Sequence, residues 1–299
     1  MPWLQVVLTT DQERASLIEA ALENIGALAV TLDDAGDEPL LEPPPGATPL
    51  WGKIQVTALF AADESHRKEA ETLVASLAEH LATQPRFERI EDQAWEHTWR
   101  DDFAPTPFGE RLWVCPRGER PKDEHPDQVI VTLDPGLAFG TGHHPTTALC
   151  LRWLDRADLT GARLIDYGCG SGILAIAALK LGAAHALALD HDPQALEATL
   201  ANAAENGVAD RLLCLKACDA SPGISGYQAD YLVANILASP LIKLAPKLAA
   251  FLRPGGFLAL SGLLVDQIET VASAYAPWLD LAPPEIREEW VLLAGYRRE

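Results

Sequence analysis

Residues 166–172 read DYGCGSG, a stretch that combines one acid with three glycines. It begins at the end of the strand-like run RLIDY (163–167) and leads into the helix-like run ILAIAALKLG (173–182). Glycine has no Cβ, so Gly168 and Gly170 let the backbone of this turn approach a ligand closely. Strands and helices alternate from here to the end of the chain, which predicts a doubly wound, mainly parallel α/β sheet.

The glycine spacing indicates the kind of ligand. A dinucleotide-binding turn follows the pattern G-x-G-x-x-G and receives a pyrophosphate at the helix N-terminus. Here the spacing is G-x-G-x-G, and Asp166 lies two residues before the first glycine. An acid at this position would repel a pyrophosphate and favour a cationic ligand such as S-adenosylmethionine, which carries a sulfonium and an ammonium group. We therefore interpret Asp166 as an anchor for that ammonium group or for a water molecule.

A second acid ends the next predicted strand, HALALD (185–190). Asp190 at that position can accept hydrogen bonds from both hydroxyls of a ribose, by the geometry of dinucleotide-binding folds. The alternative is that Asp190 caps the following helix, although Asp192 is better placed for that role. Asp219 follows the third strand and is either an adenine contact or a solvated loop residue.

The first part of the chain has a different pattern. Strands are expected over 3–9, 27–34, 53–61 and 85–93, and helices over 11–26 and 63–81. This β-α-β-β-α-β order predicts a small ferredoxin-like α/β domain over residues 1–93. A linker over residues 94–102 follows, in which Trp95 and Trp99 would share one face of a helix. The large α/β domain is expected over residues 103–299.

The charge excludes some functions. The chain of 299 residues has a formal net charge of −20, from 43 acidic and 23 basic residues. Direct binding to a nucleic-acid backbone requires Lys and Arg, so we expect none. A basic protein partner fits better, although high solubility alone is an alternative explanation.

Cysteine usage and hydropathy set further limits. Five cysteines without a C-x-x-C pair provide neither a disulfide framework nor a metal site. The N-terminal residues lack a basic segment followed by a long apolar segment, and no apolar run is long enough to span a membrane. We expect a soluble, cytoplasmic monomer without a membrane anchor.

Four segments together resemble one protein family. They are LDPGLAFGTGHHPTTALC (133–150), DYGCGSGILAIAALKLGA (166–183), VANILASPL (233–241) and LRPGGFLALSGLL (252–264). The chain resembles the PrmA family, which are class I S-adenosylmethionine-dependent methyltransferases that modify large-subunit ribosomal protein eleven. The resemblance implies methyl transfer to lysine ε-amino groups and to an N-terminal α-amino group. It also implies that the N-terminal domain recognises the ribosomal protein and that the linker lets the domains reorient.

The resemblance assigns cofactor contacts to Thr147, Gly168, Asp190 and Asn235. It gives a function to residues 138–147, which we expect to fold over the methionine end of the cofactor. Phe139 would cover the sulfonium by a cation–π contact, and Thr141 would offer a hydroxyl. The alternative for this segment is a turn followed by a helix N-cap at Thr146 or at His144 and Pro145.

Two residues are candidates for catalysis. A lysine amine must be neutral to attack, and its pKa is about 10.4 in water. Desolvation near the sulfonium cation lowers that pKa, so a dedicated base is not required. Asn235, at the end of the fourth strand, could accept the amine N–H groups, although it could also merely cap a turn. His144 is a candidate proton acceptor because imidazole titrates near neutrality.

Other functions stay open on the sequence alone. A methyltransferase of the same fold could act on another protein, on RNA or on a small molecule. A non-catalytic assembly factor could bind S-adenosylmethionine without turnover. A nicotinamide oxidoreductase is disfavoured by the glycine spacing.

Overall fold

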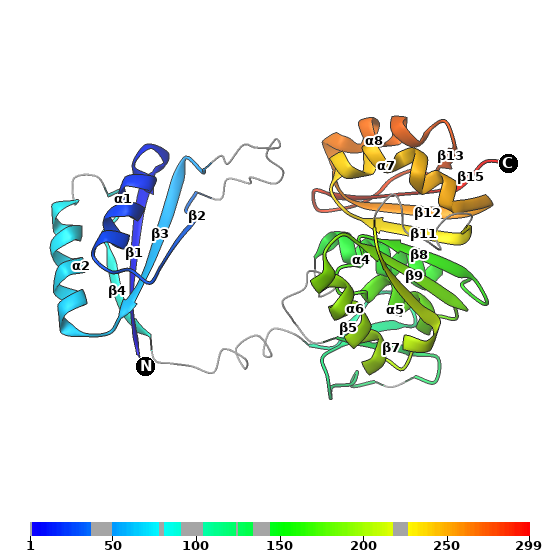
Figure 1. Cartoon of the computed structure of the whole chain (residues 1–299), viewed down its shortest axis with the longest axis horizontal. Coiled ribbons are helices and arrows are strands. Elements are labelled where there is room, and N and C mark those ends of the chain that lie inside the picture. Colours follow the sequence, from blue (N-terminus) through cyan, green and yellow to red (C-terminus); the bar gives the residue numbers. More distant parts are fainter. Residues whose placement is uncertain are drawn as a thin grey trace. The chain divides into compact units, whose positions relative to one another are not determined.

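The computed structural model describes residues 2–36, 50–77, 81–90, 104–123, 125–133, 144–217 and 227–299. The chain forms two compact units, Met1–Trp95 and Glu96–Glu299. Figure 1 draws the first unit in blue to cyan, and most of the second in green to red.

The first unit is an antiparallel sheet with two helices. Its strands lie in the order β2-β3-β1-β4, which is the ferredoxin-like order, and the predicted β-α-β-β-α-β sequence of elements is confirmed. The elements are β1 (Trp3–Asp11), α1 (Gln12–Asn24), β2 (Ala29–Asp34), β3 (Lys53–Ala61), α2 (Glu64–Ser76) and β4 (Arg86–Ile90).

Local sequence signals explain where α1 lies. The Asp11 side chain accepts a hydrogen bond from the Arg14 N–H, so Asp11 is the N-cap. Gly26 follows the helix with a φ of 91°, a left-handed conformation that glycine adopts without strain. Alternate residues of β1 point towards the helices, and Val6 and Leu8 are fully buried there.

The second unit is built around a large, mainly parallel sheet. Its strand order is β10-β9-β8-β11-β12-β15-β13, with β14 paired to β15. The pairs β10–β9, β9–β8, β8–β11 and β11–β12 are parallel, and β15 is antiparallel to β12. The predicted doubly wound sheet is therefore confirmed. Its strands are β8 (Arg163–Tyr167), β9 (His185–Asp190), β10 (Leu212–Lys216), β11 (Ala229–Asn235), β12 (Leu252–Leu264), β13 (Leu279–Leu281), β14 (Glu285–Arg287) and β15 (Trp290–Arg297).

Helices cover both faces of this sheet (Figure 1). The residues of β8 alternate between the two faces, with Leu164 in one buried cluster and Ile165 in the other. One face packs against α4 (Pro145–Arg156), α5 (Ile173–Lys180) and α6 (Pro193–Glu205). The other packs against α7 (Ala238–Phe251) and α8 (Ile268–Tyr275). Two short 3₁₀ helices, η2 (Ala209–Arg211) and η3 (Val265–Gln267), complete the unit.

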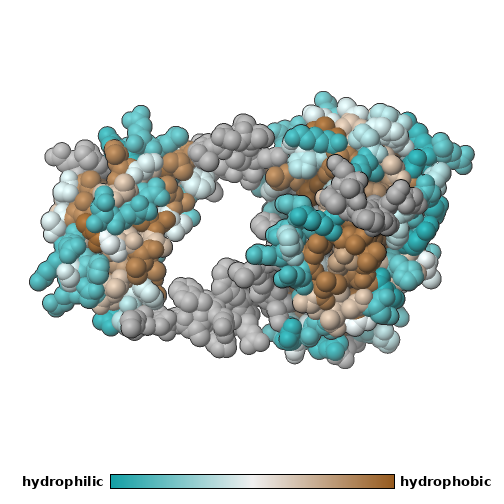
Figure 2. Space-filling model, viewed as in Figure 1, coloured by the Kyte–Doolittle hydropathy of each residue, from teal (hydrophilic) through white to brown (hydrophobic). Residues whose placement is uncertain are grey.

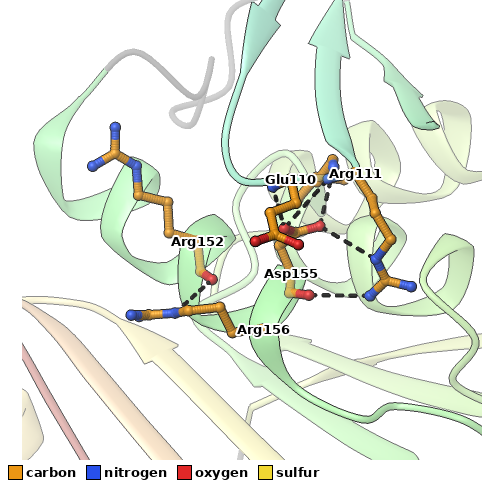
Figure 3. A network of polar contacts seen from close by, with 6 residues as sticks. Glu110, Arg111, Arg152, Asp155 and Arg156 are labelled. Carbon is orange, nitrogen blue, oxygen red and sulfur yellow. Dashed lines mark hydrogen bonds and ion pairs between the residues drawn. The ribbon is translucent and has the colours of Figure 1, made fainter. Parts of the chain in front are cut away.

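A small sheet precedes the large one. It consists of β5 (Thr106–Pro107), β6 (Leu112–Cys115) and β7 (Val129–Thr132). The Asp155 side chain on α4 holds the β5–β6 turn (Figure 3). Its carboxylate accepts hydrogen bonds from the backbone N–H groups of Glu110, Arg111 and Leu112, at 2.7, 3.4 and 3.0 Å. A Cβ on Gly109 would lie 2.1 Å from this carboxylate, so a larger residue would force the turn or the Asp155 side chain to shift.

The surfaces of the two units mix hydrophilic and hydrophobic residues (Figure 2). In the first unit Leu17 and Leu28 are exposed, and in the second Leu213, Leu237 and Ile286 are. Within the described ranges, none of the helices has the length and hydropathy needed to cross a bilayer.

Candidate active site

The predicted site residues of the large sheet lie together at the carboxyl ends of its central strands. Asp166 belongs to β8, Asp190 ends β9 and Asn235 ends β11. These three strands are parallel neighbours, so their carboxyl ends face the same way. This edge is where ligands bind in open α/β sheets.

The glycine turn has a conformation that explains its composition. Gly168, Gly170 and Gly172 all have left-handed backbones, with φ values of 80°, 54° and 79°. The N–H of Gly168 donates to the Leu189 carbonyl at 2.7 Å, which places the turn beside the end of β9. A Cβ on Gly168 would lie 2.3 Å from Cγ2 of Ile236. The turn therefore packs directly against the loop that follows Asn235.

Asp190 holds a fixed orientation beside this turn. Its Oδ2 accepts a hydrogen bond from the Gly170 N–H at 3.0 Å, and its Oδ1 accepts one from the Asp192 N–H at 3.1 Å. Asp192, not Asp190, is the N-cap of α6, where it accepts from the Gln194 N–H at 2.9 Å. The capping alternative for Asp190 therefore has no support in the structure.

Asp166 is completely buried and only half satisfied. Its Oδ2 accepts a hydrogen bond from the Ala175 N–H at 3.0 Å, while its Oδ1 has no partner among the described residues. Burial, the largest cause, and the negative charge of Asp190 together raise the pKa of Asp166 to about 7, against the lowering effect of the hydrogen bond from the Ala175 N–H. An unpartnered buried carboxylate oxygen is costly, and a cation supplied by a ligand would satisfy it.

These features fit a cationic cofactor. Two carboxylates, Asp166 and Asp190, lie on either side of a glycine turn. Negative groups in this position suit an ammonium and a sulfonium, and they oppose a phosphate. S-adenosylmethionine, which carries a sulfonium and an ammonium group, meets this requirement.

The N-terminus of α4 lies at the same edge. His144 is the N-cap, with Nδ1 accepting a hydrogen bond from the Thr146 N–H at 3.4 Å and lying 2.7 Å from its hydroxyl. The His144 ring meets Trp290 edge to face, with 4.8 Å between ring centroids. This histidine therefore has a structural role whatever chemistry it performs.

Thr147 and Asn235 are brought together although they are far apart in the sequence. The Asn235 side-chain amide donates a hydrogen bond to the Thr147 hydroxyl at 3.2 Å. Thr147 is buried and Asn235 is half-buried. This bond leaves the side-chain oxygen of Asn235 free to accept from another group.

Some predictions fall outside the described residues, namely those for Phe139, Thr141, Asp219, Trp95 and Trp99. The structure also adds residues that the sequence interpretation missed. Trp290 contacts His144, and Thr199 contacts the glycine turn. Trp290 lies in the C-terminal segment EEWVLLAGYRR, which is part of the family resemblance but has no assigned role, and Thr199 belongs to no recognisable motif.

Comparison with known proteins gives a consistent result. The family model described as Ribosomal protein L11 methyltransferase (PrmA) matches residues 2–298. A ribosomal protein L11 methyltransferase of Hahella chejuensis is 52% identical over 99% of both chains. One of Marinobacter nauticus is 49% identical over the whole of both. Among solved structures, a ribosomal protein L11 methylase of Lactobacillus delbrueckii subsp. bulgaricus is 34% identical, with a TM-score of 0.60 over 66% of this chain and all of that one.

Proposed function

The chain belongs to the ribosomal protein L11 methyltransferase family, and from this premise we propose that it transfers methyl groups from S-adenosylmethionine to amino groups of ribosomal protein L11. The acceptors are lysine ε-amino groups and the N-terminal α-amino group. The observation that carries the proposal is the pair of carboxylates, Asp166 and Asp190, on either side of the glycine turn. That pair provides the negative environment that a sulfonium cofactor requires.

The cofactor supplies, when bound, a methyl group on a positively charged sulfur, so the protein has mainly to bind and orient. Asp166 anchors the ammonium end through its unpartnered Oδ1, and Asp190 accepts from the ribose. Gly168 and Gly170 let the backbone come close to the ligand, and Thr147 contributes its hydroxyl. Phe139 and Thr141 would complete the methionine end of the site.

Asn235 is the residue that would orient the acceptor amine. Its amide nitrogen already donates to Thr147, which fixes the amide plane. The side-chain oxygen can then accept an N–H of the amine and direct the nitrogen lone pair towards the methyl group. Removal of the amine from water keeps it neutral, because desolvation disfavours the charged form.

His144 has two candidate roles. It caps α4 through Nδ1, and a neutral ring in that arrangement carries its hydrogen on Nε2. To accept a proton from the amine it would have to take the other tautomer. A pH–rate profile of His144→Asn distinguishes the roles, because asparagine preserves the cap. An unchanged profile leaves His144 as a cap alone, and the loss of an ionisation near neutrality identifies it as the proton acceptor.

We further propose that residues 1–93 recognise the protein substrate and that residues 94–102 link this domain to the catalytic domain at 103–299. The net charge of −20 supports a basic protein partner rather than nucleic acid. A ribosomal protein as substrate implies work in the cytoplasm, and we expect a monomer.

Intact-mass spectrometry of purified ribosomal protein L11 tests the proposal. Incubation with this protein and S-adenosylmethionine should give a ladder of added methyl groups, and peptide mapping would then identify the amines. The variant Asn235→Ala should produce little or no ladder, even at a cofactor concentration that saturates it. The wild-type protein may be titrated in parallel with S-adenosylhomocysteine by calorimetry. If the protein binds S-adenosylhomocysteine but adds no methyl groups to ribosomal protein L11, the proposed substrate is wrong.

A further inference from the structure

Helix α6 presents a row of polar side chains to the protein interior. Thr199, Asn202 and Asn206 are spaced three and four residues apart, so they lie on one face of the helix. Thr199 is fully buried and Asn206 is 8% exposed. Polar groups at such positions are costly unless they make specific hydrogen bonds, so the partners of this row are informative.

Thr199 and Asn202 hold the glycine turn. The Thr199 hydroxyl donates to the Gly170 carbonyl at 2.9 Å, and the Asn202 side-chain amide donates to the Ser171 carbonyl at 2.9 Å. A Cβ on Gly172 would lie 2.7 Å from Cγ2 of Thr199, so the helix and the turn are in direct contact.

A neighbouring thiol completes the arrangement. Cys169 Sγ lies 3.4 Å from the Thr199 hydroxyl oxygen. Burial raises the pKa of the Cys169 thiol, so its sulfur keeps the hydrogen. The Thr199 hydroxyl has only one hydrogen, and it is already donated to Gly170. The thiol is therefore the donor, and Cys169, Thr199 and Gly170 form one directional chain.

Gly170 is held on both sides. Its N–H donates to Asp190 Oδ2 at 3.0 Å, while its carbonyl accepts from Thr199. A rotation of the backbone around Gly170, which glycine tolerates at little cost, would break both bonds. Thr199 prevents that rotation and thereby maintains the bond that orients the Asp190 carboxylate.

We propose that Thr199 and Asn202 are positioning residues for cofactor binding, which act through the glycine turn and Asp190. The inference rests on the proposed function, because it takes this turn as the cofactor site. It predicts that the two side chains contribute to cofactor affinity without contacting the cofactor. It also predicts that they do not affect the methyl-transfer step once the cofactor is bound.

The main test is Thr199→Val, which keeps the shape of the side chain and removes the hydroxyl. S-adenosylhomocysteine titrated into the full-length variant should bind about tenfold more weakly, the value of one buried hydrogen bond. The KM for S-adenosylmethionine should rise by a similar factor, while kcat at saturating cofactor stays unchanged. Thr199→Ser restores the hydroxyl and should recover most of the affinity.

Asn202→Ala and Asn206→Ala form a matched pair on the same helix face. Asn206 bonds both the N–H and the carbonyl of Thr132 at 2.8 Å, so it holds β7 rather than the turn. We expect Asn202→Ala to weaken binding of the probe, and Asn206→Ala to lower the melting temperature with no change in Kd. Equal weakening in both variants would mean general loosening and would overturn the inference.

Other outcomes of these experiments also decide between the proposals. An unchanged Kd in Thr199→Val, with a lower melting temperature, would make Thr199 purely structural and overturn the inference. Should Thr199→Val fail to fold, the comparison of Asn202→Ala with Asn206→Ala decides alone. Wild-type protein that binds the probe but does not methylate ribosomal protein L11 would contradict the proposed substrate and leave this test valid. Wild-type protein that does not bind the probe would overturn both proposals.

Discussion

Two aspartates of the second unit are almost inaccessible to solvent, but they differ in what surrounds them. Asp155 is 5% exposed and accepts hydrogen bonds from the backbone N–H groups of three consecutive residues. Arg111 adds a positive charge, with Nε 3.8 Å from Oδ1 (Figure 3). Asp166 is 0% exposed, accepts one backbone N–H and has one oxygen without a partner in the described part of the chain.

The difference lies in how far the protein itself satisfies each buried carboxylate. Burying a charged group costs free energy unless hydrogen bonds or an opposite charge offset that cost. Asp155 receives both from the protein itself, so its surroundings are complete. Asp166 receives a single hydrogen bond and no positive charge from the described residues. Because this does not offset its burial, its pKa is raised to about 7. A perturbed, incompletely bonded acid in a ligand-binding edge is a feature of functional sites.

The largest expected effect is on folding stability at the structural carboxylate. Asp155→Ala removes the acceptor of three backbone N–H groups on the β5–β6 turn. We expect the free energy of unfolding to fall by about 3 kcal/mol, since each buried donor left unpaired is costly. Urea denaturation of the full chain, with peptide-resolved hydrogen exchange over residues 110–112, measures this loss. The affinity for S-adenosylhomocysteine should not change.

Asp158→Ala is the control for that experiment. Asp158 lies just beyond the end of α4, and its carboxylate accepts a hydrogen bond from the exposed Thr160 N–H at 3.2 Å. Its replacement should leave exchange over residues 110–112 as it is in the wild type. An Asp155→Ala variant as stable as the wild type would mean that water accepts the three backbone hydrogen bonds equally well. Asp155 would then not be the structural carboxylate that the comparison with Asp166 requires.

At Asp166, the carboxylate that we propose as a cofactor contact, we expect an effect on cofactor affinity rather than on stability. Asp166→Asn keeps an acceptor for the Ala175 N–H and removes the charge. S-adenosylmethionine should bind between about tenfold and a hundredfold more weakly, because a charged hydrogen bond is lost. The unfolding free energy should stay the same or rise, since a buried charge is no longer present. Calorimetry and urea denaturation measure the two quantities. Lower stability with unchanged affinity would reverse the roles assigned to the two aspartates.

The sequence predicted one of these acids and not the other, for a physical reason. Asp166 lies in a glycine turn between a strand and a helix, and the chemistry of that turn is local. Asp155 lies near the end of an amphipathic helix, where an acid is normally solvated. Its partners are more than 40 residues away, in a turn with no distinctive pattern. A local sequence pattern does not reveal which distant backbone N–H groups will contact a given side chain in the folded protein.

The same distinction applies to the rest of the fold and site. The alternation of strands and helices predicted both sheets, because each element has its own hydrophobic period. The short strands β13 and β14 have three residues each and were not predicted, since so few residues show no period. Asn235 and Thr147 were predicted separately, and their contact required the fold. In the sequence Thr199 is indistinguishable from a solvent-exposed polar residue of a helix. Its contact with the glycine turn became evident only in the structure.

A smaller effect is expected from a change beside the structural carboxylate. Gly109→Ala would place a methyl group 2.1 Å from Asp155 Oδ2, so either the turn or the side chain must shift. We expect the unfolding free energy to fall by about 1–2 kcal/mol, the usual cost of an added methyl group in a packed region. Gly36→Ala is a useful reference, because its backbone is not left-handed and its Cβ would meet nothing closer than 3.6 Å. Faster hydrogen exchange over residues 110–112 in Gly109→Ala alone is the expected result.

The last expected effect is a pH dependence specific to Asp166, which is spread over several pH units. The pKa of this carboxyl is about 7 in the folded protein and near 3.8 when unfolded. Between those values the folded state holds a proton that the unfolded state has released, so stability falls as pH rises. The slope is up to about 1.4 kcal/mol per pH unit, and it ends above about pH 7, where both states are ionised.

Other acids titrate in the opposite sense, so the measurement is a difference. The measured quantity is the unfolding free energy of the wild type minus that of Asp166→Asn, in which the contributions of the other acids cancel. This difference should decrease from about pH 5 to about pH 8. Saturating S-adenosylmethionine should abolish the decrease, because its ammonium group stabilises the ionised form. A difference that is flat with pH in the free protein would mean that Asp166 is already ionised and that its second oxygen has found a donor within the chain, so that the contrast with Asp155 would disappear.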